Sequence, residues 1–283
     1  MMDLYVEAIG LCAPGMDGWP AGREVLRGAC PFTASPMILP ECDLLPAAER
    51  RRAVPSVKLA LGVANEAVRA STRNPATLAT VFSSSVADGR TIHEILQVLA
   101  TSGREISPTR FHNSVHNAAA GYWHIASKSR EASTSLCSRH ASFAAGLLES
   151  ATRVTVGNEP VLLVVYDVPF PPPLDAQHPI SSSFGVALLL AAVETGQSLA
   201  RMGIELVRGF PITICTGSLV LEELRAGNPA ARCLPILAAL ACGEARTVYL
   251  DYANGNALSV SITPQERQMT FRNGQPDCGA GAD

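Results

Sequence analysis

The sequence contains eight cysteines but lacks any CxxC pair, and the cysteines are scattered from position 12 to position 278. Zinc-ligand spacing is therefore absent, and a disulfide framework is not expected in a chain of 283 residues that is 47% hydrophobic. A clustered basic surface is also missing, since the net charge is -3 and the pI is about 6.1. The absence of a basic surface argues against a nucleic-acid-binding protein.

Long hydrophobic runs are absent as well. The longest, residues 186–193, is far too short to span a bilayer. No basic-then-apolar leader opens the chain. We therefore expect a soluble, reduced, cytoplasmic protein that needs no membrane, metal or cofactor.

The most informative stretch is residues 133–149, which read as a short strand, a polar bend and a helix of small and apolar residues. From Ala141 the period becomes helical, because Phe143 and Leu147 fall on one face. Cys137 stands at the bend, where free N–H groups and the helix dipole favour a thiolate. Cys137 is thus either a nucleophile or, like most free cysteines, a small buried hydrophobe.

Strands alternate with helices along most of the chain, and an Asn-Gly turn at residues 254–255 predicts a terminal hairpin. This order predicts an α/β layered domain with a mixed sheet over residues 1–263, followed by a flexible polar tail, 264–283. The expected strands are residues 4–11, 78–82, 161–166, 183–193, 247–252 and 257–262; the expected helices are 19–28, 46–70 (divided at Pro55), 91–100 with Thr91 as N-cap, and 234–241.

Residues 110–117 form an unusual polar stretch that leads into the small-residue helix beginning at Ala118. His112 and His116 are separated by one helical turn, a spacing that suits two metal ligands. No acidic residue lies between them and no third ligand is near, so a metal site is not predicted. The run 118–121 is better interpreted as a close helix-packing or subunit-packing surface, with Phe111 nearby.

These two stretches, residues 107–121 and 133–149, resemble the β-ketoacyl synthases, in which an Asn-rich turn and a small-residue helix precede the strand, nucleophile elbow and helix. Residues 234–262 resemble the end of short, single-half members. Most of the chain is similar to the ketosynthase-like chain-length factors of aryl polyene and xanthomonadin-type clusters. The resemblance implies a thiolase-like fold with a single N-terminal-type half, a mixed sheet between helix layers and a C-terminal β-hairpin.

The departures from the ketosynthase pattern imply an incomplete catalyst. Active ketosynthases need two histidines from their second half, whereas the last histidine here is His178. The expected nucleophile position falls on Cys137 or Ser138, and Arg139 and His140 stand where active enzymes carry small residues. Without a histidine base the chain lacks the expected general acid–base partner and oxyanion donor.

The resemblance also implies a role in assembly. The strand before the elbow, residues 132–137, would be an edge strand that pairs across a dimer two-fold axis, and such an edge needs a partner. We expect this surface to bind a full-length β-ketoacyl synthase as a heterodimer and to wall its acyl tunnel during extension of a carrier-protein-bound polyene. The expected interface and tunnel residues are Phe111, His112, Asn113, Val115, His116, Asn117, Thr134, Ser135, Leu136, Cys137 and Phe143.

Two other interpretations remain open. The first is a small acyltransferase or hydrolase that uses Cys137 with His140 or His116. The second is a homodimeric module that binds an acyl group or an acidic acyl carrier protein through exposed arginines, either residues 50–52 or Arg104 and Arg110. Each aromatic residue of the expected interface has an alternative place as well: it lies either in the tunnel wall or in this chain's own core.

Overall fold

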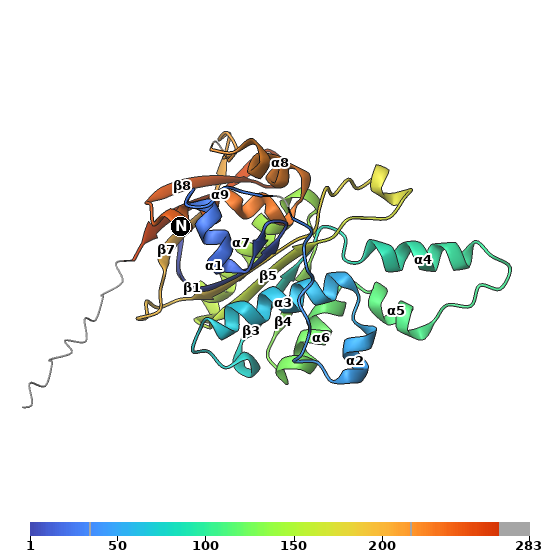
Figure 1. The fold of residues 1–283 in the computed structure, drawn as a ribbon. Coiled ribbons are helices and arrows are strands. Elements are labelled where there is room, and N and C mark those ends of the chain that lie inside the picture. Colours follow the sequence, from blue (N-terminus) through green and yellow to red (C-terminus); the bar gives the residue numbers. More distant parts are fainter. Residues whose placement is uncertain (34, 216, 266–283) are drawn as a thin grey trace, which may run out of the picture.

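The structure of the protein is a computed structural model that describes residues 1–33, 35–215 and 217–265 (Figure 1). Its strands are β1 (Met2–Ala13), β2 (Met16–Asp17), β3 (Ala79–Ser83), β4 (Ser133–Leu136), β5 (Val161–Asp167), β6 (Phe184–Ala191), β7 (Ala200–Arg208), β8 (Arg246–Asp251) and β9 (Asn256–Pro264). Its helices are α1 (Trp19–Leu26), α2 (Ala47–Arg52), α3 (Pro55–Arg69), α4 (Gly89–Leu99), α5 (Pro108–Ser114), α6 (Ala118–Ser127), α7 (Ser142–Gly157), α8 (Leu219–Gly227) and α9 (Leu234–Cys242).

The strands form one mixed sheet in the order β4-β3-β5-β6-β1-β7-β9-β8, and β2 pairs with β1. The pairs β3–β4 and β3–β5 are parallel, whereas β5–β6 and the remaining pairs are antiparallel. The apolar run of β5 is buried on both faces, as expected for a strand between two helix layers. Val161, Leu163 and Val165 therefore enter one core and Leu162, Val164 and Tyr166 the other.

The two cores differ in which helices cover them. Helices α3 and α6 pack on one face, where Trp123 and Tyr122 are fully buried. Helices α7, α9 and α1 pack on the other face, together with the buried sides of β7, β8 and β9. The mixed sheet between helix layers and the β8–β9 hairpin predicted from the sequence are thus confirmed.

One turn of the C-terminal segment packs against helix α7, which follows the bend at Cys137. The 3-10 turn Ala230–Cys233 contacts α7, and α9 packs against that turn and against β8 and β9. Helix α7 also packs on β1, β3 and β5, and its Phe143 and Leu147 have no exposed surface. The turn 230–233 therefore covers part of α7, and α9 packs behind that turn.

Helices α4 and α5 project from the body of the molecule as a helical hairpin, which we call the arm (residues 89–114, Figure 1). Buried polar side chains fix the root of the arm. Asp88 caps α4 by accepting a hydrogen bond from the Thr91 N–H at 2.8 Å, and it accepts another from the Ser56 hydroxyl at 2.6 Å. Asn113, near the end of α5, donates to the Arg52 carbonyl oxygen and accepts from the Tyr122 hydroxyl.

Most predicted elements are present, with two corrections. The N-cap of α4 is Asp88 and not Thr91, because Asp88 precedes the helix and its carboxylate accepts a hydrogen bond from the Thr91 N–H, whereas Thr91 lies inside the first turn. Strand β7 and helix α8 were not predicted at all. The separate tail domain, residues 264–283, falls almost wholly outside the described residues, with β9 reaching Pro264.

Candidate functional site

The bend after β4 is a tight elbow at the start of α7. Arg139 has a φ of 49°, a left-handed conformation that reverses the chain between the strand and a 3-10 turn, Arg139–Ala141. Ser142 fixes this geometry: its hydroxyl accepts from the Ser138 N–H at 3.1 Å and donates to the Arg139 carbonyl oxygen at 2.7 Å. The sequence pattern of strand, bend and helix is therefore correct, with the elbow held by hydrogen bonds.

The thiol of Cys137 is used in a hydrogen bond to the backbone. It donates to the Ser85 carbonyl oxygen, with Sγ 2.8 Å from the oxygen, although the residue as a whole is exposed. The hydrogen bonds of the described residues include none between Cys137 Sγ and a histidine nitrogen. The geometry therefore couples this thiol to the loop after β3 and not to a base.

A buried carboxylate orders that loop. Asp167, at the end of β5, accepts hydrogen bonds at one oxygen from the Ser84 hydroxyl, the Ser85 N–H and the Ser85 hydroxyl, at 3.0, 2.8 and 2.7 Å. Burial raises the pKa of Asp167 to about 6, and the bonds from Ser85 and Ser84 oppose that rise. Asp167 thus positions Ser85, which in turn holds Cys137.

Two histidines lie beside the elbow. His140 and His178 line a cavity of about 160 Å³ together with Ser85 and Arg139. His116, the other histidine proposed as a partner of Cys137, instead lies between α5 and α6. The elbow cavity therefore brings together Ser85 and the two histidines His140 and His178, of which only His140 had been proposed as a partner for Cys137.

His112 and His116 do not share a helical face. Helix α5 ends at Ser114, and Val115 has extended backbone angles before α6 begins at Ala118. His112 packs its ring edge-on against Tyr122, with the centroids 5.7 Å apart. Among the described residues, no group of three or more His, Cys, Asp or Glu side chains is arranged to hold a metal ion.

The predicted interface residues divide into exposed and buried sets. Phe111 is 62% exposed and Val115 39% exposed, while His112, Asn117 and Cys137 are also exposed and His116, Thr134, Ser135 and Leu136 half-buried. Asn113 and Phe143 are buried, at 3% and 0% exposed. The structure therefore leaves Phe111 and Val115 available on the surface and places Phe143 in the core beneath α7.

Strand β4 forms the free edge of the sheet. Its Ala132 and Leu136 carbonyl oxygens accept from the Thr80 and Ser84 N–H groups of the β3 side. Because backbone groups alternate along a strand, those of Ser133 and Ser135 point away from β3. The predicted edge strand is confirmed, since β4 pairs with β3 alone in the part of the chain that the structure describes.

The opposite edge of the sheet, β8, is covered by the chain itself. The Thr213 N–H donates to the Tyr249 carbonyl oxygen, and the Tyr249 N–H donates to the Thr213 hydroxyl, both at 2.9 Å. Phe210 stacks on the Tyr249 ring, with the centroids 4.7 Å apart. One edge is thus blocked by a loop and the other, at β4, is left open.

Sequence reasoning missed the link between Asp167 and the two serines. Residues 83–85 follow the expected strand 78–82, and Asp167 follows the expected strand 161–166, but neither was predicted as a functional position. Both strands are parallel neighbours, so their carboxyl ends meet at one edge of the sheet. The sequence signal for this contact was the position of both segments directly after predicted strands.

Comparison with known proteins identifies a family model, "Beta-ketoacyl synthase, N-terminal domain", that matches residues 27–206. No curated protein sequence matches the chain. In the described residues, no helix is long and apolar enough to cross a membrane.

Several solved structures share the fold. A chain of "Ketosynthase (ApeO) in Complex with its Chain Length Factor (ApeC)" from Xenorhabdus doucetiae is 22% identical, with a TM-score of 0.70; the match covers 92% of this chain and 100% of that one. A chain from a type II PKS acyl-carrier protein in complex with its ketosynthase (AntDE:AntF) is 11% identical, with a TM-score of 0.74 and coverages of 93% and 99%. Ketosynthase twelve of the bacillaene polyketide synthase from Bacillus amyloliquefaciens is 11% identical (TM-score 0.55), and the match covers 80% of this chain but 48% of that one.

Proposed function

This chain belongs to the family of β-ketoacyl synthase N-terminal domains, and from that premise we propose that it is a chain-length factor. It would be a catalytically incomplete ketosynthase-like subunit that pairs with a complete β-ketoacyl synthase and shapes its acyl tunnel. The proposed product is an aryl polyene or fatty-acid-like polyketide, built on an acyl carrier protein. The assignment to aryl polyenes rests on the sequence resemblance.

The observation that carries this proposal is the difference between the two edges of the sheet. An uncovered strand edge presents N–H and C=O groups that attract another strand, and monomeric proteins block such edges. The loop around Thr213 blocks β8, whereas β4 has no covering segment among the described residues. The open edge lies directly before the elbow, at the position where a second ketosynthase-like subunit would pair.

The arm supplies a second surface for the same partner. On α4, Leu96 is 51% and Leu99 is 40% exposed, and on α5 Phe111 is 62% exposed. Exposed apolar side chains that recur on one face of a projecting helix indicate a surface meant for a partner. The buried bonds of Asp88 and Asn113 hold the root of the arm, so the surface is ordered before pairing.

The elbow supports the catalytically incomplete part of the proposal. A condensing enzyme needs a thiolate and a base within hydrogen-bond reach of it. The Cys137 thiol instead donates to the Ser85 carbonyl oxygen. Among the residues predicted for the tunnel wall, Phe111 and Val115 have the bulk and exposure to close the end of a partner's tunnel.

The test is co-expression of this chain with a complete ketosynthase encoded beside it, followed by mass analysis after size exclusion. A complex with one copy of each chain is expected. Ser135→Pro removes an outward N–H and should abolish pairing, while Ser135→Ala keeps that N–H and should pair normally. Equal thermal melting of the two variants alone controls for folding. If Ser135→Pro pairs as well as the unmodified chain, β4 is not the docking edge.

A second candidate function is a small acyltransferase or hydrolase, which the cavity shared by His140, His178 and Ser85 favours. It would require a shift of Cys137 from the Ser85 oxygen toward one of the histidines. An isolated chain that hydrolyses acyl thioesters, and loses that activity in Cys137→Ala and in His140→Ala, would establish this function in place of the chain-length factor.

A further inference from the structure

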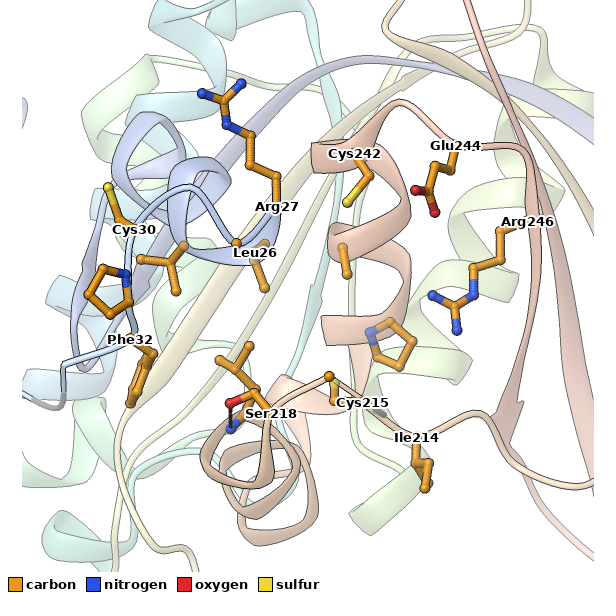
Figure 2. A pocket seen from close by; sticks show the side chains of 17 residues that line it. Leu26, Arg27, Cys30, Phe32, Ile214, Cys215, Ser218, Cys242, Glu244 and Arg246 are labelled. Atoms are coloured by element: carbon orange, nitrogen blue, oxygen red, sulfur yellow. Dashed lines mark hydrogen bonds between the residues drawn. The ribbon is translucent and has the colours of Figure 1, made fainter.

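A separate pocket of about 500 Å³ opens between α1, α8 and α9 (Figure 2). None of the residues that line it belongs to β4, to the elbow or to the arm. Its volume falls within the range of about 300–1,000 Å³ that is usual for small-molecule sites. The pocket therefore requires an explanation apart from subunit pairing.

The wall of the pocket is apolar and fixed in place. Leu26 and Leu221 belong to the core, and Pro235 and Ala238 line the pocket from α9. The Cys215 N–H donates to a Glu222 carboxylate oxygen at 2.9 Å, and Glu222 forms an ion pair with the buried Arg225. These bonds hold the segment before α8 against α8 itself and so fix that wall of the pocket.

Cysteines contribute to this lining without forming a metal site. Cys30, Cys215 and Cys242 all border the pocket, but no metal-holding group exists among the described residues. Burial, followed by the nearby Glu222 charge, raises the pKa of Cys215 to about 11. At neutral pH that thiol is protonated and acts as part of the apolar wall.

The charged side chains stand at the mouth. Arg27, Glu244 and Arg246 are the three charged residues in the lining. Arg27 is paired with Glu24, whereas the ion pairs of the described residues do not include Arg246 or Glu244. Figure 2 shows the Arg246 guanidinium and the Glu244 carboxylate turned toward the pocket from the strand β8 side.

We propose that this pocket binds a monocarboxylate with an extended apolar body, its chain against Leu26, Leu221 and Pro235 and its carboxylate on Arg246. Arg246 forms no ion pair with the described residues, and its guanidinium supplies a forked set of donors that fits a carboxylate. Glu244 lies on the same side and disfavours ligands with two or more negative charges. The site is independent of the proposed pairing with a ketosynthase.

The probe is cis-parinaric acid, an unsaturated carboxylic acid whose fluorescence rises in an apolar site, titrated into the full-length chain below its micelle concentration. Arg246→Gln should weaken its binding by about tenfold, equivalent to about 1.4 kcal/mol. Ala238→Phe, which fills the wall, should weaken it by at least as much. Arg208→Gln, an exposed arginine outside the pocket lining, is the matched control and should bind like the unmodified chain.

The methyl ester of the same probe separates the anchor from the apolar wall. The ester has no charge, so it should bind the unmodified chain and Arg246→Gln equally well and should still be weakened by Ala238→Phe. Binding of the acid that is unchanged in both Arg246→Gln and Ala238→Phe, or no binding to the unmodified chain, would overturn the proposal. Because the chain is tested alone, failure here leaves the pairing experiment unaffected.

Discussion

Cys137 donates its thiol proton to the carbonyl oxygen of Ser85, across the gap between the elbow and the loop after β3. Ser85 in turn donates twice to Asp167, through its N–H and its hydroxyl. Cys137, one of the two residues predicted for the nucleophile position, is thereby part of a chain of hydrogen bonds that orders a loop. In this arrangement the thiol has a structural partner in place of a catalytic one.

Replacing the thiol therefore should not stop chain extension. In a reconstituted pair with a complete ketosynthase, Cys137→Ala is expected to keep the rate of product formation within about twofold of the unmodified pair. The positive control is alanine at the nucleophilic cysteine of the complete ketosynthase, which should abolish the reaction. A loss of product from Cys137→Ala that equals this control would show that both thiols carry acyl groups.

The two phenylalanines proposed for the tunnel wall should separate in their effects. Phe143 has no exposed surface, so Phe143→Ala is expected to destabilise the chain by about 3–5 kcal/mol through lost packing. Phe111 is 62% exposed, and Phe111→Ala should change stability by no more than about 0.5 kcal/mol.

Denaturant unfolding measures both stabilities, and mass spectrometry of the products from the reconstituted pair measures chain length. We expect longer products with Phe111→Ala, because removing its bulk deepens the tunnel. An unchanged product distribution with Phe111→Ala would remove this residue from the tunnel wall, whatever the result for Phe143→Ala.

The buried carboxyl of Asp167 predicts a pH-dependent stability. Its pKa of about 6 in the folded chain exceeds the ordinary aspartate value, so the folded state holds a proton that the unfolded state releases. The stabilisation is complete below the ordinary pKa and is lost as the pH rises through 6. The two-unit difference corresponds to about 3 kcal/mol.

Asp167→Asn keeps a side-chain oxygen for Ser84 and Ser85 but cannot ionise. The stability of the unmodified chain relative to Asp167→Asn should therefore fall between pH 4 and pH 7, measured by urea unfolding at each pH. The matched control is Asp43→Asn, because Asp43 is an exposed aspartate whose side chain is 67% accessible. A difference that stays flat, or that rises with pH, would contradict the buried, protonated carboxyl.

The sequence predicted those elements whose pattern is strong within one short stretch of residues. The unbroken run of β5 and the Asn-Gly turn, where Asn254 and Gly255 both have positive φ, were sufficient to predict a buried strand and the terminal hairpin. Strand β7 was missed although Met202 and Ile204 alternate with Arg201 and Glu205, a pattern of a half-buried strand. Its short alternation carries less signal than a continuous apolar run.

Contacts between distant segments were beyond the sequence. Phe143 lies in one core with side chains from positions 4 to 262, and the hydrogen bond from Ser85 to Asp167 joins positions 82 residues apart. Whether an apolar side chain enters the core or faces a partner cannot be read from its local period, since both use the same helical spacing. Leu96 and Leu99 show this: their face of α4 is apolar, yet it stays exposed.

The exposed apolar face of α4 allows a direct test of whether the arm contacts the partner. A lysine at position 96 should leave the isolated chain folded, because Leu96 is already 51% exposed, but it would place a charge within the proposed contact with the partner. We expect Leu96→Lys to weaken pairing with a complete ketosynthase by at least about tenfold, or about 1.4 kcal/mol, measured by analytical ultracentrifugation. Gln97→Lys puts the same charge on the neighbouring exposed position and should pair normally. Equal affinities for the two variants would mean that the arm lies outside the interface and that β4 alone makes the contact.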